Sequence, residues 1–258
     1  MSIPLTILTA VKPYFPERGL VLDYPVPING TEWERVGERA GDLEVAKVLD
    51  SFPGKITRND IVGLRHEDSG VRRRRVAITS LMWGYGITGA RWKERWVSAV
   101  SGFLRSSGLN DVLACCEEHL GRGEVAEAYK LFTNAGEDAR IEVEKYYGIG
   151  AAFFTKILYF LARNAQQDSS ARYPLILDTR VSMALSWMTG YRLLARPASY
   201  RPRPDSGAYA RYVERMHAWA GELDVAAEVI EYYLWAEARE SASQLWAECE
   251  KQHGGDFP

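Results

Sequence analysis

The 258-residue sequence has only three cysteines, Cys115, Cys116 and Cys249. Their number and spacing exclude a disulfide framework, a four-ligand zinc site and a four-cysteine iron–sulfur cluster. The sequence also has no apolar run as long as a membrane span, and its first ten residues lack the basic start and apolar region of a secretory signal. These absences predict a cytoplasmic protein with reduced thiols, no membrane segment, no metal and no cofactor.

Hydrophobic residues make up 47% of the chain, enough for a sizeable core, and they recur mostly at helical spacing. No alternation is sustained enough for a large sheet. We therefore predict an all-α fold, a single unit of two lobes formed by residues 1–70 with 180–258 and by residues 71–179. Helices are predicted over 31–52 (one or two), 57–65, 72–83, 91–105, 109–120, 124–132, 140–147, 151–165, 179–187, 208–220 and 225–250.

The formal net charge of −2 is unevenly distributed along the chain. Residues 222–250 contain eight acidic residues and one arginine, a local charge of −7, so the remainder carries +5. The run Arg72–Arg75 has two interpretations, a solvated surface or a phosphate contact. A second basic cluster has no acidic residue between Asp178 and Asp205. Its members are Arg180, Arg192, Arg196, Arg201 and Arg203.

The turn Gly148-Ile149-Gly150 lies between two helical patterns. Glycines on either side of one apolar residue permit a tight reversal of the backbone. Backbone N–H groups at the head of the next helix, together with the positive end of its dipole, can bind an anion such as a DNA phosphate. An ordinary connection between two helices is the other interpretation of this turn.

An apolar segment, Leu175-Ile176-Leu177, precedes Asp178 and a second apolar helix. Asp178 stands where an N-cap residue stands, accepting hydrogen bonds from the first free N–H groups of its helix. Capping alone is a sufficient reason for an aspartate at this position.

The order of these features, the Gly-Ile-Gly turn, an apolar helix and then Pro174-Leu-Ile-Leu-Asp-Thr-Arg-Val181, resembles the helix-hairpin-helix/Gly-Pro-Asp superfamily of DNA glycosylases. Within it the sequence is most similar to 8-oxoguanine-glycosylase-like proteins. The resemblance implies a helix-hairpin-helix motif at a cleft between the lobes, and Gly148, Ile149 and Gly150 as a DNA-binding turn. It also implies that Asp178 is the catalytic aspartate, which stabilises the oxocarbenium-like charge on the sugar.

The sequence departs from that family pattern at the lysine of the lyase-type members, where Ala152 stands. A Schiff base cannot form there, so water is the expected nucleophile and the expected enzyme is monofunctional. Lys156, one helical turn further on, is a candidate for the missing amine, although it can equally extend to solvent or contact phosphate. Arg180 stands where a histidine often follows the Asp-Thr pair, and the segment between turn and aspartate is several residues longer than usual.

The expected partner is double-stranded DNA with a damaged or modified base, bound by a monomer. The arginines that follow Asp178 are the expected phosphate contacts. Trp83 and Tyr85, at the glycine-flanked end of the predicted helix 72–83, are candidates for the base pocket, with core packing as the alternative. The excised base and the role, repair or defence against modified foreign DNA, stay open. A catalytically silent DNA-binding module and a helical protein-interaction protein are the two alternative functions.

Overall fold

Residues 8–66, 68–86, 93–133, 149–165, 172–189 and 205–236 are described by the computed structural model of the chain. Their regular structure consists of helices and one antiparallel pair of short strands, β1 (Val26–Pro27) and β2 (Lys55–Ile56). The predicted all-α class is confirmed. In the described part of the chain, no helix is long and apolar enough to cross a membrane.

The chain divides into two units, Leu22–Pro174 and the pair of segments Met1–Val21 and Leu175–Pro258. One predicted lobe likewise combined the N-terminal segment with the C-terminal third of the chain. That predicted lobe extended to residue 70, whereas the N-terminal segment of the smaller unit ends at Val21. In the structure residues from 22 onward belong to the larger unit, because α3 (Gly30–Ala40) packs on α7 (Lys93–Arg105). The rings of Trp33 and Trp96 meet at that contact with centroids 5.4 Å apart.

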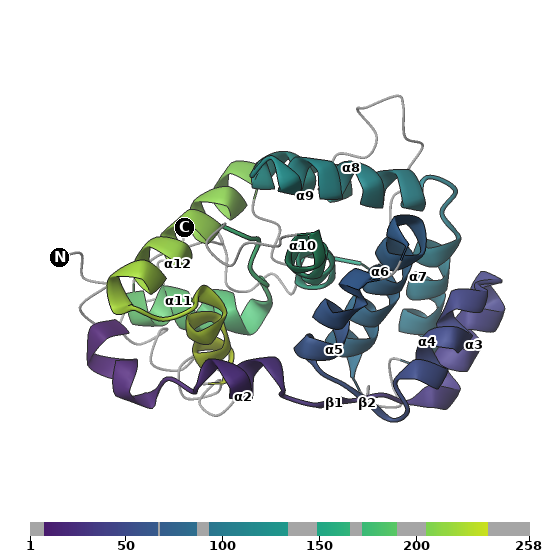
Figure 1. The fold of residues 1–258 in the computed structure, drawn as a ribbon, viewed down its shortest axis with the longest axis horizontal. Helices are drawn as coiled ribbons and strands as arrows, with labels where there is room; N and C mark the ends of the chain where they lie inside the picture. The colour runs from purple at the N-terminus through teal and green to yellow at the C-terminus, as the bar shows by residue number, and fades with distance from the viewer. Residues whose placement is uncertain are drawn as a thin grey trace, which may run out of the picture. The chain divides into compact units, whose positions relative to one another are not determined.

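The larger unit is built around α10 (Ala151–Ala165), which has the predicted bounds. Phe154, Ile157, Leu158, Phe160 and Leu161 of this helix are all buried. Burial of each such side chain contributes about 1.5–3 kcal/mol relative to exposure, so α10 organises the core of this unit. Figure 1 shows α10 almost along its axis, next to α8 and α6. The other helices of the unit are α4 (Leu43–Ser51), α5 (Arg58–Gly63), η2 (Leu64–His66), α6 (Ser69–Tyr85), α8 (Leu109–Gly121) and α9 (Val125–Thr133).

Helix starts in this unit follow local sequence signals. At the start of α5, Thr57 and Asp60 form a reciprocal capping box, in which each side chain accepts the backbone N–H of the other residue. Asp42 caps α4 and Asp68 caps α6 by a single bond each, in which one carboxylate oxygen accepts a backbone N–H of the first turn. The predicted helices that fall on described residues have end points a few residues from those observed. The predicted helix 140–147 and the end of the predicted helix 225–250 lie outside the described residues.

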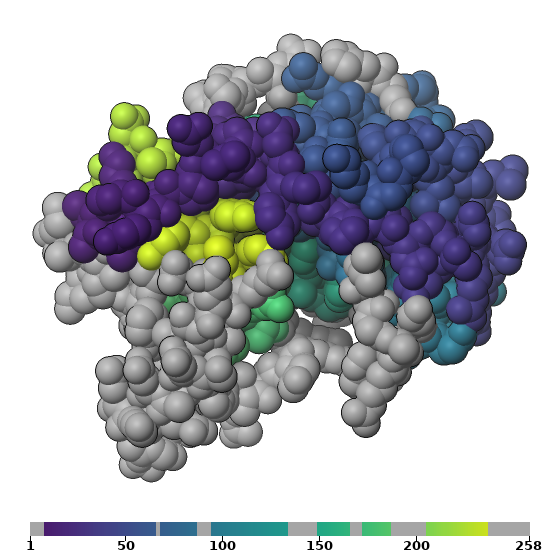
Figure 2. Space-filling model, turned by 90° about the horizontal axis from the view of Figure 1, so that it is seen from below, coloured from purple at the N-terminus to yellow at the C-terminus, as the bar shows by residue number. Residues whose placement is uncertain are grey.

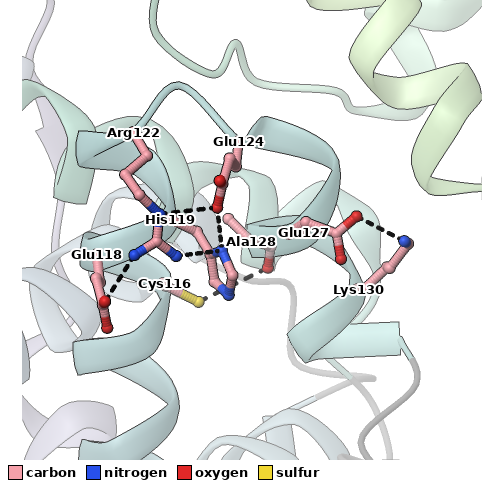
Figure 3. A network of polar contacts seen from close by, with 8 residues as sticks. All are labelled: Cys116, Glu118, His119, Arg122, Glu124, Glu127, Ala128 and Lys130. Atoms are coloured by element: carbon pink, nitrogen blue, oxygen red, sulfur yellow. Dashed lines mark hydrogen bonds and ion pairs between the residues drawn. The ribbon is translucent and has the colours of Figure 1, made fainter.

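A polar network closes the turn between α8 and α9 (Figure 3). Glu124 lies 2.7 Å from Nδ1 of His119 and 3.0 Å from Nε of Arg122, and Arg122 also donates to Glu118 at 2.6 Å. The His119 ring and the Arg122 guanidinium hold the pKa of the Glu124 carboxyl below its ordinary value. These contacts fix an exposed turn on the surface of the larger unit.

The smaller unit joins the N-terminal segment to the last described helix. Arg18 bonds to the fully buried carboxylate of Glu228 at 2.9 Å, and Phe15 packs on Tyr233 with ring centroids 5.0 Å apart. Figure 2 shows residues 8–21, in purple, running across the helix at 227–236, in yellow. The remaining elements that contribute to this unit are η1 (Lys12–Tyr14), α2 (Arg18–Leu22), α11 (Thr179–Thr189) and α12 (Ser206–Leu223).

Candidate active site

Asp178 caps α11, as the sequence predicts. Its Oδ1 accepts the N–H of Val181 at 2.9 Å, and its carbonyl oxygen accepts the N–H of Ser182 at 3.0 Å. The first N–H groups of a helix have no partner within the helix, so a carboxylate at this place satisfies one of them and faces the positive end of the dipole. The side chain is half-buried. Within the described residues Oδ2 makes no hydrogen bond, so one carboxylate oxygen is available for another partner.

The segment that leads to Asp178 belongs to no helix or strand and is buried, with Leu175, Ile176 and Leu177 at most 2% exposed. Side chains from two later helices bond to its backbone: Tyr209 and Tyr212 of α12 donate to carbonyl oxygens, and Glu231 accepts an N–H. None of these three residues was predicted from the sequence as part of the site. The available signal was Glu231 itself, a carboxylate between the apolar pairs Val229-Ile230 and Tyr233-Leu234 of a helix.

Arg180, at the second position of α11, is exposed and its guanidinium carbon lies 5.6 Å from the centre of the Trp235 ring. This distance is within the range of a cation–π contact. The other predicted phosphate contacts, Arg192, Arg196, Arg201 and Arg203, lie outside the described residues, as does Gly148.

The rest of the turn, Ile149 and Gly150, leads into α10. Ile149 is 7% exposed, and the carbonyl oxygen of Gly150 accepts the N–H groups of Phe153 and Phe154 at 2.9 and 3.2 Å. Gly150 therefore occupies the N-cap position of α10. It has no positive φ, and a Cβ built there meets no atom within 4 Å. Neither the backbone conformation nor the packing at this position requires a glycine. The tight reversal predicted from the two glycines therefore does not depend on a glycine at position 150.

Trp83, Tyr85 and Lys156 lie together where α6 packs on α10. The Tyr85 ring is stacked between Phe153, at 4.0 Å, and Trp96, at 5.0 Å, so both of its faces are covered. Burial raises the pKa of the Tyr85 hydroxyl well above its usual range. Trp83 meets the edge of Phe160 at 5.9 Å.

Two cations approach the Trp83 ring, Arg58 at 5.0 Å and Lys156 at 6.0 Å from its centre. The Arg58 guanidinium is 2% exposed and also lies 5.3 Å from the Tyr159 ring. This buried group of cations and aromatic rings joins α5, α6 and α10. Arg58 was not among the residues predicted from the sequence.

Lys156 is 6% exposed and its Nζ donates to the carbonyl oxygen of Ala152. Of the alternatives considered for this lysine, extension to solvent is therefore not what the structure shows. Its aliphatic chain runs beside Gly84, where an added Cβ would lie 2.8 Å from Cδ of Lys156. Gly84 therefore permits the close approach of α6 and α10 at the lysine.

The run Arg72–Arg75 of α6 forms ion pairs with other elements of the larger unit. Each guanidinium is less than a quarter exposed and meets a carboxylate. The four guanidinium groups share three carboxylates, so every arginine of the run has an ion-pair partner within the larger unit. This pairing favours a structural role over the two interpretations of the sequence, a solvated surface and a phosphate contact. The pairs are Arg72 and Arg73 with Glu117, Arg74 with Asp42 and Arg75 with Glu44.

Together these features define an all-α protein in which an aspartate follows a buried segment and caps the next helix. A family model described as "OGG: Putative 8-oxoguanine DNA glycosylase OGG-like protein" matches residues 19–235, and the chain belongs to this family. At the level of the family the protein is a DNA glycosylase and its substrate is DNA. No curated protein and no solved structure matches the chain.

Proposed function

We propose that this protein flips a damaged or modified base out of double-stranded DNA and hydrolyses the bond between that base and its deoxyribose, with Asp178 as the catalytic carboxylate. The observation that carries the proposal is the place of Asp178, directly after a buried segment and at the start of α11, in a chain of the OGG-like family.

Cleavage of a glycosidic bond develops positive charge on the sugar, as in the oxocarbenium-like transition state of glycoside hydrolysis. A carboxylate fixed beside that charge stabilises it more than it stabilises the neutral ground state. The bond from Val181 N–H to Oδ1 fixes the orientation of the Asp178 carboxylate, and Oδ2 is left to face the sugar or the attacking water. Capping and catalysis are thus compatible roles.

Water is the nucleophile in this proposal. Ala152 has no amine, and Lys156 is buried with its Nζ bonded to a backbone carbonyl. An amine that forms a Schiff base must lose its proton and reach C1′ of the sugar. The buried arrangement of Lys156 therefore favours a monofunctional glycosylase without strand cleavage by β-elimination.

DNA is held by the N–H groups at the start of α10 and by the arginines that follow Asp178. Gly148, Ile149 and Gly150 form the phosphate-binding turn, and Arg180 is the described member of a set that includes Arg192, Arg196, Arg201 and Arg203. The open space beside Gly150 supports close approach of a phosphate to the backbone. Contacts of this kind offset the few kcal/mol that extrusion of a base costs.

The extruded base contacts the aromatic group of the larger unit. Because both faces of Tyr85 are covered, we assign the base-facing role to Trp83 and a supporting role to Tyr85. Repair of oxidised or alkylated DNA and defence against modified foreign DNA are both served by this chemistry. We further propose that the protein acts as a metal-free monomer in the cytoplasm.

The test is incubation of the protein with duplexes that carry 8-oxoguanine, an alkylated purine or a hydroxymethylated cytosine, followed by mass spectrometry of the released bases. Asp178→Asn is compared on whichever duplex the wild type cleaves. Asn is about as good an N-cap as Asp, so the change costs well under ~1 kcal/mol of stability. A catalytic role predicts that base release falls by orders of magnitude while DNA affinity is kept, because a neutral amide supplies no counter-charge.

The competing function is a catalytically silent DNA-binding module, in which Asp178 is only a cap. The hydrogen bond from Val181 N–H is sufficient for that role as well. Equal base-release rates for wild type and Asp178→Asn would remove the catalytic assignment. Salt-dependent DNA binding without release of any base would favour the module, and the absence of DNA binding would favour a protein-interaction role.

A further inference from the structure

The segment Leu175–Leu177 is buried and belongs to no helix or strand. Buried backbone N–H and C=O groups without a partner cost free energy comparable to a lost hydrogen bond, so they are paired in nearly all native proteins. In this segment, at least three of these partners are side chains and not a neighbouring strand.

The three side chains come from two helices of the same unit. Tyr209 and Tyr212, one turn apart on α12 and both fully buried, donate their hydroxyl groups to the carbonyl oxygens of Leu175 and Ile176, at 2.8 and 3.0 Å. From the helix at 227–236, Glu231 accepts the N–H of Ile176 at 2.9 Å and is 2% exposed.

We propose that Tyr209, Tyr212 and Glu231 are positioning residues that set the place of the Asp178 carboxylate; this rests on the proposed catalytic role of Asp178. Both peptide planes flanking Ile176 are fixed, one through its N–H and one through its carbonyl oxygen. Only the backbone of Leu177 separates this fixed pair from Asp178. The cap bond to Val181 then fixes the carboxylate from the other side.

Placement of this accuracy matters because a misplacement of about 1 Å at a reacting group can cost about 100-fold in rate. Rigid aromatic side chains on a long helix hold a segment more firmly than exposed polar groups do, since their rotamers are locked by packing. A purely structural role is the alternative, in which the same hydrogen bonds stabilise the fold but the position of Asp178 does not depend on them.

Four single variants separate the two roles. Tyr209→Phe and Tyr212→Phe each remove one hydroxyl and leave the ring in place. Glu231→Leu removes the acceptor for Ile176 N–H, whereas Glu231→Gln keeps an acceptor oxygen. Tyr14→Phe is the control, the same chemical change on an exposed side chain of the same unit.

The first measurement needs no substrate. Amide hydrogen exchange is followed by NMR at Ile176 and at Val181, whose N–H is held by Asp178. Positioning predicts that Tyr212→Phe and Glu231→Leu accelerate exchange at Val181 by about tenfold or more, that Glu231→Gln restores most of the protection, and that Tyr14→Phe changes nothing. Unchanged exchange at Val181 in Tyr209→Phe, Tyr212→Phe and Glu231→Leu overturns the proposal. If Glu231→Leu does not fold, exchange at Val181 in Tyr209→Phe and Tyr212→Phe decides between positioning and a purely structural role.

The second measurement is the single-turnover rate of base release from the duplex that the wild type cleaves. Positioning predicts that Tyr212→Phe is roughly 10- to 100-fold slower at unchanged DNA affinity. In an Asp178→Asn background the same change should slow the reaction no further, because the carboxylate it positions is gone. The proposal is contradicted if Tyr212→Phe slows base release by the same factor in the Asp178→Asn background as in wild type. It is also contradicted if both Tyr209→Phe and Tyr212→Phe keep the wild-type rate. If Asp178→Asn itself keeps the wild-type rate, the proposed function fails, and exchange at Val181 still decides whether the three side chains fix the cap.

Discussion

Nζ of Lys156 donates to the carbonyl oxygen of Ala152, the residue that stands where lyase-type glycosylases have their lysine. The candidate amine is therefore bonded to the backbone at that position. Helical side chains tilt toward the N-terminus of their helix, which brings a lysine at i+4 back to residue i. The side chain is buried against Phe153 and Gly84. Its amine is thereby close to the start of α10 but held within the protein core.

A protein that uses water should form no covalent complex with DNA in the presence of borohydride, because no Schiff base is available for reduction. The measurement is gel electrophoresis after incubation of wild type and Lys156→Gln with the duplex from which base is released. A trapped species in the wild type that disappears in Lys156→Gln would show instead that Lys156 leaves its bond to Ala152 and acts as a lyase.

Gly84→Ala should destabilise the protein by about 1–3 kcal/mol, the usual cost of added volume in a packed core. The new methyl would lie 2.8 Å from Cδ of Lys156 and 3.3 Å from Cδ1 of Phe153. Gly102→Ala in α7 is the matched control: a Cβ there meets nothing, and replacing a helical glycine by alanine stabilises by about 0.5–1 kcal/mol. Urea denaturation measures both. Equal effects of the two variants would contradict the packing of Lys156 against Gly84.

Gly150→Ala should leave the free energy of unfolding within about 1 kcal/mol of wild type, since the site is open and its φ is negative. DNA binding should nevertheless weaken, because a methyl group at the N-cap keeps a phosphate away from the first N–H groups of α10. Fluorescence anisotropy with an undamaged duplex measures this, with Gly102→Ala again as the control. Wild-type affinity in Gly150→Ala would argue against a phosphate at this turn.

Arg180→Gln should lower the slope of log affinity against log salt by about 1, the change expected from loss of one phosphate contact. Arg73→Gln removes the same charge from a guanidinium that is paired with Glu117, 3.0 Å away, and should leave the slope unchanged. Binding of an undamaged duplex is measured from low to physiological salt. A slope reduced equally by both variants would mean that the Arg72–Arg75 run also reaches DNA.

Stability should fall with acid partly through Glu124. His119, and after it Arg122, lower the pKa of this carboxyl in the folded protein below its ordinary value of 4.5. Because the unfolded chain takes up the proton first as the pH falls, the contribution is present above that value and is lost as the pH drops through the folded pKa. Denaturant unfolding between neutral pH and about pH 3 should therefore show a shallower acid decline in Glu124→Gln than in wild type.

His119→Gln provides the control for this network, since the ring nitrogen is the nearest group to Glu124. In the His119→Gln background, Glu124→Gln should change the acid decline less than it does in wild type. If Glu124→Gln changes the acid decline equally with and without His119, the lowered pKa of Glu124 is due to Arg122 alone.

Local rules in the sequence determined most of the helices. The bounds of α10 follow from an unbroken apolar pattern after Gly150, and the start of α5 follows from the reciprocal pair Thr57 and Asp60. The cap bond of Asp178 likewise joins two residues three positions apart. Each of these features is decided by short-range geometry, which a single sequence contains.

The partners of charged and polar side chains were decided only by the tertiary structure. Arg74 looks like part of a basic surface in the sequence, yet it pairs with Asp42, which lies 32 residues earlier. Glu231 looks like part of an acidic tail, yet it is buried and holds the backbone of Ile176, 55 residues away. Helical periodicity tells which face of a helix is apolar, but not which other segment that face meets. The sequence therefore determined the helices and the aspartate that begins α11, whereas long-range packing decided which side chains hold that aspartate in place, because those contacts join residues that no local pattern relates.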